Sequence, residues 1–232
     1  MAAGGRATEG RLLAGTILDG TQPRTFQNTV LAVDADGQVV DRYQKRHLVP
    51  FGEYVPFRSA LDWFPPLDQV PRDGQPGGPA HRVVVDDLDV AVAICFETLF
   101  PSVVRQNVLA GEQPAGIVVA ATNDASFGRG GEAAQHIAQS QLRALETGRW
   151  VVHGAVSGAS AFVDPDGDVH GRTDLFEATT RRMTVGATSG RTPFLVTGDW
   201  LGPVTMLGLA VLALLGLARR RRARTTPRNP DG

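Results

Sequence analysis

Short apolar runs separated by turn-forming residues make up most of the chain before residue 175. Runs of this length, many of them rich in valine, are typical of β-strands. We therefore expect strands over residues 12–18, 29–33, 38–43, 82–85, 90–95, 116–121 and 150–156. The sequences Asp34-Ala35-Asp36-Gly37 and Asp164-Pro165-Asp166-Gly167 are turn signals, which predict one hairpin between the second and third strands and another over residues 160–173.

Two segments between these strands predict helices, at residues 101–110 and 133–147. The second segment has the periodicity of an amphipathic helix, with several side chains near one face. These side chains are Ile137, Gln141, Leu142 and Leu145. Strands interleaved with helices favour a mixed α/β domain.

The segment from Leu201 to Ala218 contains no charged residue. As a helix it would be about 27 Å long, close to the thickness of the hydrocarbon core of a bilayer. Trp200 precedes it and arginines follow it, which is the flanking pattern of a membrane span. We expect residues 1–199 to form the globular domain, 200–218 a transmembrane helix and 219–232 a basic cytoplasmic tail. A buried core helix is the alternative interpretation of the apolar segment.

The positive-inside rule then places residues 1–199 on the outer face of the cell membrane. Residues 1–10 contain neither a signal-peptide core nor a spanning helix that would export them. We therefore expect either that this orientation is wrong or that the chain is part of a longer membrane protein.

The charge is unevenly distributed along the chain. The formal net charge is −1, but six arginines lie after Ala218, and up to that residue 17 basic residues face 23 acidic ones. An acidic body of this kind repels nucleic acid, so no nucleic-acid partner is expected. The one cysteine cannot form an intramolecular disulfide, and the five histidines lack metal-site spacings, so no structural zinc site or disulfide framework is expected.

Cys95 ends the apolar run Val90–Cys95 and precedes a predicted helix, so it is expected at a strand end where the chain turns sharply. Backbone amides after such a turn point toward the sulfur, and a helix N-terminus favours a thiolate, as a nucleophile requires. A small buried apolar side chain is the other interpretation of a lone cysteine.

Lys45 is the one lysine among 23 lysine and arginine residues. A surface cation would not need to be lysine in a chain that otherwise uses arginine. Lysine is a compact point donor whose charge responds to burial, which suits a group that stabilises a thiolate or an oxyanion. Chance retention of a single lysine is the alternative.

Several motifs in order carry a family resemblance. Tyr43 to Pro56 reads YQKRHLVPFGEYVP, followed by Cys95-Phe96-Glu97, by Asn123 to Gly128 (NDASFG) and by Arg143-Ala144-Leu145-Glu146. Over residues 12–218 the chain resembles the apolipoprotein N-acyltransferases, the membrane branch of the nitrilase superfamily. The resemblance implies a nitrilase-like α-β-β-α sandwich for the catalytic domain, followed by one C-terminal transmembrane helix.

The resemblance also implies roles for individual residues. Cys95 matches the nucleophile, Lys45 the catalytic lysine and Glu53 the glutamate that supports this lysine, while Phe96 and Glu97 match supporting positions. The general-base glutamate of the family lies upstream of the strand at residues 12–18, where the chain has only Glu9 in an unrelated context, so we expect the chain as given to lack this base. Glu53 and Glu97 could also be helix-terminal stabilisers, and Asn123 and Asp124 turn or cap residues.

The activity implied by the resemblance is transfer of a fatty acyl chain from a phospholipid to the N-terminal amine of a diacylglyceryl-cysteine lipoprotein, through a cysteine thioester and without a cofactor or a metal. Phe57, Leu61, Trp63 and Phe64, with Tyr54 nearby, could form an apolar lid or part of the core. Two other functions stay open, a nitrilase-type amidase and an inactive remnant of the acyltransferase.

Overall fold

A computed structural model describes residues 10–61, 70–85 and 88–225 of the chain; side chains are not described at Leu61, at Ser126 or after Leu217. The chain divides into a unit of residues Met1–Val196 and a second unit of residues Thr197–Gly232. Each unit is described by itself.

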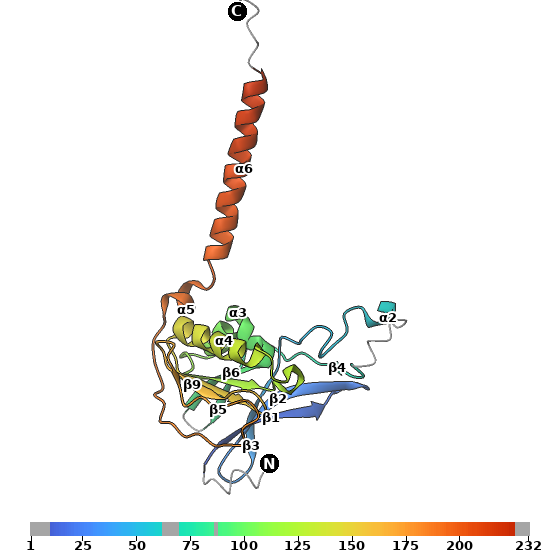
Figure 1. The fold of residues 1–232 in the computed structure, drawn as a ribbon, viewed down its shortest axis with the longest axis vertical. Helices are drawn as coiled ribbons and strands as arrows, with labels where there is room; N and C mark the ends of the chain where they lie inside the picture. The colour runs from blue at the N-terminus through green and yellow to red at the C-terminus, as the bar shows by residue number, and fades with distance from the viewer. Residues whose placement is uncertain (1–9, 62–69, 86–87, 226–232) are drawn as a thin grey trace, which may run out of the picture. The chain divides into compact units, whose positions relative to one another are not determined.

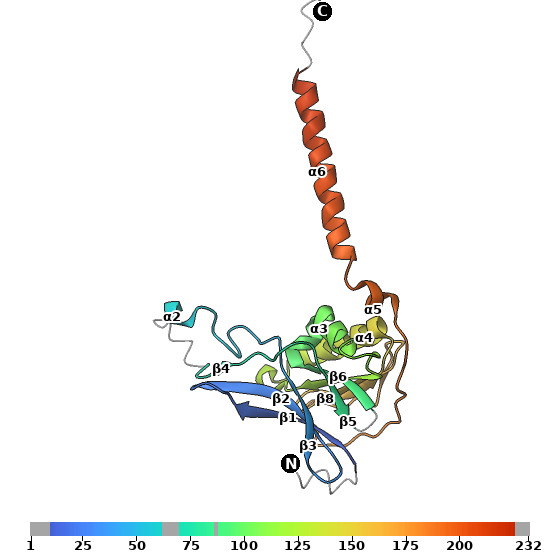
Figure 2. The same ribbon diagram turned by 180° about the vertical axis from the view of Figure 1, so that it is seen from behind.

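The first sheet is formed by the N-terminal part of the chain (Figures 1 and 2). Its strands are β1 (Leu12–Asp19), β2 (Thr25–Val33), β3 (Val39–Gln44) and β4 (Asp73–Gly74). Strands β1, β2 and β3 are neighbours and antiparallel, and β4 pairs with β2 in parallel. The predicted hairpin between β2 and β3 is confirmed, and Gly37 in its turn has a φ of +81°, which a glycine adopts without strain.

The second sheet has the order β10-β9-β8-β7-β6-β5. Its strands are β5 (Arg82–Val85), β6 (Leu88–Ile94), β7 (Ile117–Thr122), β8 (Val151–Ala155), β9 (Ala161–Val163) and β10 (Val169–His170). The central strands β6, β7 and β8 are parallel, so their carboxyl ends meet at one edge of the sheet. Ligands of α/β sheets commonly bind at this edge.

Helices connect the parallel strands. The 3-10 helix η2 (Cys95–Leu99) and α3 (Pro101–Val108) lead from β6 to β7, and η3 (Ala125–Phe127) with α4 (Glu132–Thr147) leads from β7 to β8. Gly148, with a φ of +64°, ends α4 in the left-handed conformation typical of a helix C-terminus. The remaining helices are α2 (Arg58–Leu61), α5 (Pro193–Thr197) and α6 (Leu201–Thr225).

The two faces of β6 pack against different layers. Val90, Val92 and Ile94 lie in a buried cluster with residues of the first sheet, such as Val30 and Tyr43. The alternate residues Ala91 and Ala93 lie in the cluster on the helical side, with Val104 of α3 and Ala144 of α4. Large side chains therefore fill the space between the sheets, and small ones let the helices approach closely.

The mixed α/β fold is confirmed, and the predicted strands and both long helices of the first unit are present with boundaries shifted by a few residues. The described residues form three layers, with α3 and α4 on the second sheet and the first sheet on its other face (Figure 1). The fourth, outer helical layer of the expected α-β-β-α sandwich is not formed by the residues described.

The predicted inward face of α4 is partly wrong. Ile137 is buried, but Leu142 and Leu145 are 47% and 52% exposed. The buried face instead carries polar side chains that have partners inside the protein. His136 pairs with Asp124, and Ser140 pairs with His153. A hydrophobicity pattern cannot identify a face that is buried through hydrogen bonds.

We expect substitutions on the exposed side and on the buried side of α4 to have very different effects on the free energy of unfolding. Leu142→Gln should change the free energy of unfolding by less than about 0.5 kcal/mol, because the side chain is exposed. Ala144→Leu, at a fully buried position in the helix-side cluster, should cost about 1 to 3 kcal/mol through overpacking. Denaturant unfolding of both variants measures the difference, and equal effects would mean that α4 faces the other way.

The C-terminal unit contains the helix α6, which covers the segment predicted to be helical. Its described side chains, from Leu201 to Leu217, are exposed. In the described part of the chain, no helix combines the length and the apolar character that a membrane span requires.

Candidate active site

Cys95 directly follows the carboxyl end of the parallel strand β6, where η2 begins. Its φ of +51° is in the left-handed region, so the chain makes the sharp turn that the sequence predicts at this residue. The hydroxyl of Thr98 donates a hydrogen bond of 2.9 Å to the carbonyl oxygen of Cys95 and secures the turn. A strained residue with a reactive side chain at a strand end is typical of a nucleophile.

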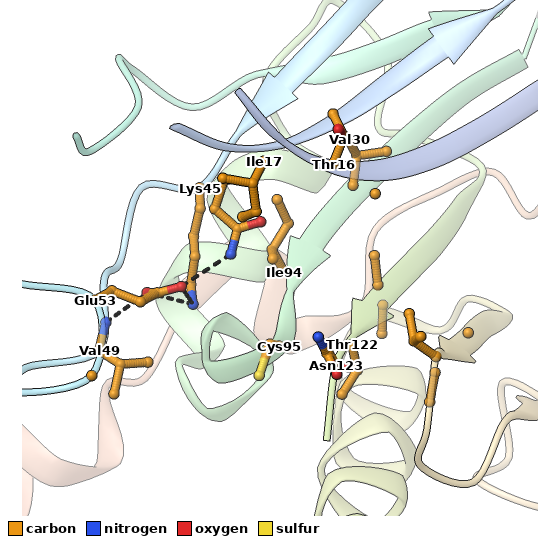
Figure 3. A pocket seen from close by; sticks show the side chains of 18 of the residues that line it. Thr16, Ile17, Val30, Lys45, Val49, Glu53, Ile94, Cys95, Thr122 and Asn123 are labelled. Atoms are coloured by element: carbon orange, nitrogen blue, oxygen red, sulfur yellow. Dashed lines mark hydrogen bonds and ion pairs between the residues drawn. The ribbon is translucent and has the colours of Figure 1, made fainter. Parts of the chain in front are cut away.

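Lys45 and Glu53 form a buried ion pair beside this turn (Figure 3). The side chain of Lys45 is 1% exposed, and its ammonium lies 2.9 Å and 2.7 Å from the two carboxylate oxygens of Glu53. Glu53 also accepts hydrogen bonds from the side-chain amide of Asn28 at 3.0 Å and from the backbone amide of Val49 at 2.8 Å. Four contacts thus fix the carboxylate, and the carboxylate in turn fixes the ammonium.

Glu97 connects the two sides of the site from beneath. It is fully buried, and its carboxylate accepts hydrogen bonds from the Tyr43 hydroxyl at 3.0 Å and from the backbone amides of Arg46 and His47 at 2.7 Å and 3.0 Å. Its second oxygen accepts from the amide of Ile94 at 2.9 Å. One carboxylate therefore binds the backbone directly after Lys45 and directly before Cys95.

Tyr43 remains a hydrogen-bond donor in this network. Burial raises the pKa of its hydroxyl far above the ordinary value, and the neighbouring Glu97 raises it further. The side-chain amide of Asn107 donates to the same hydroxyl at 2.9 Å and to the carbonyl of Val92 at 2.9 Å. The network thereby links β3, β6 and α3 under the site.

A pocket of about 1190 Å³ opens over Cys95, Lys45 and Glu53. Its walls come from both sheets and are mostly apolar away from these three residues. The apolar lining includes Leu13, Ile17, Phe26, Val30, Val70, Ile94, Val119, Phe127 and Val152. Small-molecule pockets usually measure about 300 to 1,000 Å³, so this one has room for a long apolar ligand.

Some groups around Cys95 raise the pKa of its thiol and others lower it. Burial raises the pKa of Cys95, the Lys45 ammonium lowers it, and the carboxylate of Asp124 raises it again. Hydrogen bonds from the backbone at Asn123 and Phe96 also lower the pKa of Cys95, but the net result of all these effects is a raised pKa. The thiol therefore needs a proton acceptor before it can attack at neutral pH.

The structure thus brings Cys95, Lys45 and Glu53 to one pocket and places Glu97 directly beneath. Phe96 contributes through its backbone. Of the apolar lid candidates, Phe57 is 84% exposed and is not part of the core, Tyr54 is half-buried, and Trp63 and Phe64 lie outside the described residues.

The sequence gives no role to Asn28, Tyr43 and His136, and it predicts that Asp124 is a turn or cap residue. Asp124 is 2% exposed and pairs with His136 at 2.7 Å, next to Cys95. The partners of these residues are 12 to 64 positions away in the sequence. No local signal could have found them.

Relatives of this chain are known in several bacteria. The chain is 38% identical over 203 residues to a protein of Ralstonia nicotianae named apolipoprotein N-acyltransferase, and the match covers 85% of this chain and 37% of that protein. A protein of the same name from Pasteurella multocida is 34% identical, with 79% of this chain and 35% of the relative covered. The chain thus spans less than half the length of these relatives.

Solved structures share the fold at low sequence identity. A carbon-nitrogen hydrolase from Helicobacter pylori G27 superposes with a TM-score of 0.56 at 13% identity, covering 75% of this chain and 61% of that one. An amidase from Nesterenkonia sp. superposes with a TM-score of 0.54 at 18% identity, covering 85% of this chain and 67% of that one. Residues 7–190 match the family model of the carbon-nitrogen hydrolases, and the chain therefore belongs to the carbon-nitrogen hydrolase family.

Proposed function

We propose that this chain is the thioester-forming part of an apolipoprotein N-acyltransferase. The observation that carries the proposal is the large apolar pocket with Cys95 at its base and the buried Lys45–Glu53 pair beside it. The shared name of the relatives at 29–38% identity supports acyl transfer, whereas the amidase resembles this chain in fold alone.

The proposed reaction has two acyl transfers. The Cys95 thiolate attacks an ester carbonyl of a phospholipid, and the ester oxygen leaves as the alcohol of a lysophospholipid after it gains a proton. The N-terminal amine of a diacylglyceryl-cysteine lipoprotein then attacks the thioester, so an amide forms and the thiol is restored. No redox step and no cofactor are needed.

Lys45 would stabilise the oxyanion of each tetrahedral intermediate, together with the backbone amide of Phe96. The ammonium cannot swing away, because both oxygens of Glu53 hold it and the side chain is buried. A donor fixed in this way does not stabilise the bound substrate in its ground state. It stabilises the negative charge that develops on the carbonyl oxygen in the transition state.

The proton acceptor for Cys95 is proposed to be a glutamate upstream of β1, as the family resemblance implies. Among the described residues, Glu53 is occupied by Lys45, Asn28 and Val49, and Glu97 by four donor groups. Neither carboxylate is free to take the proton of the thiol.

The helix α6 is proposed to associate with lipid. Its described surface is almost entirely apolar and exposed. The exposed apolar side chains are Leu201, Val204, Met206, Leu207, Leu209, Val211, Leu212, Leu214, Leu215 and Leu217. A helix of this kind keeps the domain where a phospholipid donor and a lipidated acceptor are concentrated.

The test of the proposed function is to trap the thioester. The complete protein, incubated with phospholipid and no acceptor, should carry an acyl adduct on the peptide containing Cys95 by mass spectrometry. Adding a diacylated lipoprotein peptide should discharge the adduct and yield an N-acylated peptide, because the amine completes the second transfer.

Cys95→Ala is the control for the adduct, since this variant keeps the pocket and removes the sulfur. An adduct that persists in the alanine variant would contradict the assignment of the nucleophile. Hydrolysis of small amides without transfer to the peptide would instead favour an amidase.

A further inference from the structure

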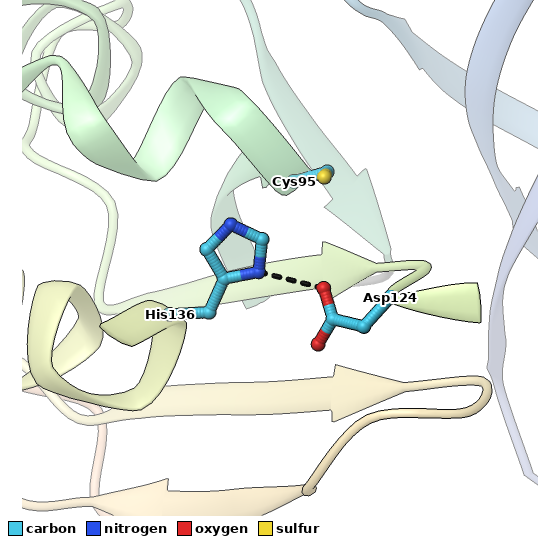
Figure 4. A group of neighbouring side chains, drawn as sticks. All are labelled: Cys95, Asp124 and His136. Atoms are coloured by element: carbon cyan, nitrogen blue, oxygen red, sulfur yellow. Dashed lines mark hydrogen bonds and ion pairs between the residues drawn. The ribbon is translucent and has the colours of Figure 1, made fainter. Parts of the chain in front are cut away.

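The side chain of Cys95 and two further side chains able to bind a metal ion lie close together (Figure 4). Cys95 comes from the end of β6, Asp124 from the segment after β7 and His136 from the first turns of α4. The sulfur, one carboxylate oxygen and one imidazole nitrogen all lie within 4.8 Å of one another. The topology of the parallel sheet creates this cluster, which the scattered positions of the histidines in the sequence do not indicate.

The size of the cluster suits a single ion. A point among three atoms that are at most 4.8 Å apart lies no more than about 2.8 Å from each of them, and zinc binds sulfur at about 2.3 Å and nitrogen or oxygen at about 2.0 to 2.2 Å. Small side-chain rotations cover the remaining distance. The His136–Asp124 contact of 2.7 Å would lengthen as both groups turn to the ion.

The donor set selects the kind of ion. A sulfur, an imidazole nitrogen and a carboxylate oxygen form a mixed set that suits Zn²⁺ and related borderline cations and that Mg²⁺ and Ca²⁺ avoid. Three protein ligands leave a fourth position for water, and of the three Cys95 is half-buried and lines the pocket. An ion can therefore reach the sulfur from the pocket.

Asp124 supplies an independent reason to expect a cation. Its second carboxylate oxygen is buried and has no hydrogen-bond partner. This oxygen lies against Gly158, and a β-carbon added to that glycine would come within 2.1 Å of it. A buried carboxylate that lacks one hydrogen bond is costly, and a divalent cation bound through its other oxygen would offset part of that cost by neutralising the buried charge.

We propose that Cys95, Asp124 and His136 form a Zn²⁺ site that reversibly blocks the nucleophile. Zn²⁺ binds the sulfur as thiolate and displaces the thiol proton to solvent, with no change of oxidation state. While the ion is bound, the sulfur cannot attack an ester. Metal binding rests on these side chains alone, and only its inhibitory effect rests on the proposed acyl transfer.

Cobalt is the probe for the site, because a thiolate bound to Co²⁺ gives a charge-transfer absorption band in the near ultraviolet. The complete protein, stripped of metal with a chelator and titrated with Co²⁺, should develop this band, and Zn²⁺ should displace it. Cys95→Ser should lack the band, and His136→Ala and the isosteric Asp124→Asn should each weaken cobalt binding about tenfold or more.

His170→Ala is the matched control. His170 also pairs with an aspartate at 2.7 Å, Asp164, but it lies on β10 and is not part of the cluster. Cobalt binding should be unchanged in this variant. The rate at which iodoacetamide alkylates Cys95 without metal checks that the site of the His136, Asp124 and His170 variants is still folded. Thermal unfolding serves as this check for Cys95→Ser, which has no thiol. In the wild type, Zn²⁺ should suppress the alkylation until a chelator is added.

The proposal is overturned if the wild type shows no cobalt band and no protection by Zn²⁺, or if both the His136 and Asp124 variants bind cobalt as tightly as the wild type. A protein that binds cobalt through Cys95 but transfers no acyl group would refute the proposed function and leave the metal site standing.

Discussion

Lys45→Arg should lower the rate of acyl transfer by about 10²- to 10³-fold, the cost of losing one oxyanion donor in other enzymes. The substitution keeps the positive charge, so a purely electrostatic role would survive it. The Lys45 side chain is 1% exposed and its ammonium is held by both oxygens of Glu53, so a longer, planar guanidinium has no room to place a donor at the same point. The single-turnover rate of thioester formation measures the effect.

The control makes the same kind of exchange on the surface. Arg181→Lys also replaces one cation by another, but Arg181 is exposed and pairs with Glu177 on the surface, so transfer should be unaffected. Transfer at nearly the wild-type rate in Lys45→Arg would show that the charge alone matters and that the lone lysine in the chain has no special role.

Glu97→Gln should lower the free energy of unfolding by at least about 2 kcal/mol, because it places an amide donor among four groups that are all donors. The Tyr43 hydroxyl and three backbone amides bond to the two carboxylate oxygens, so neither orientation of the glutamine amide satisfies them. Thermal unfolding in detergent measures the loss. Transfer should fall as well, since the loop after Lys45 is released from the turn at Cys95.

A matched change on the surface separates this effect from the loss of a charge. Glu177→Gln removes one negative charge from an exposed pair and should leave unfolding within about 0.5 kcal/mol of the wild type. If Glu97→Gln were equally harmless, the carboxylate would be a simple helix-terminal residue, which is the alternative interpretation of its position in the sequence.

The sequence predicts the strands and hairpins well because their signals are local. The turns at Asp34–Gly37 and Asp164–Gly167 carry residues that favour tight turns, and the valine-rich runs between them are strands in the structure. The orientation of α4 depends on Asp124 and His153, which belong to other strands or loops, so its own periodicity could not reveal which face is buried.

In the candidate site as well, the sequence indicates the residues with local signals but not those whose contacts form on folding. The composition singles out Lys45 and the position at a strand end singles out Cys95, because each depends on a few neighbouring residues. The contact of Tyr43 with Glu97 forms only when the two sheets pack together, and the contact of Asn28 with Glu53 joins β2 to the segment after β3, 25 positions away. The spacing of these residues along the chain therefore does not predict their contacts.

The two faces of β6 carry side chains of different size, and this difference limits insertions and deletions within the strand. Side chains alternate along a strand, so a single inserted codon in β6 would turn the valines toward the helices and the alanines toward the first sheet. The same insertion would move Cys95 one step along the strand and reverse the side to which its sulfur points. The tip of the hairpin between β2 and β3 has no such constraint, so length variation among natural variants should gather there and spare β6.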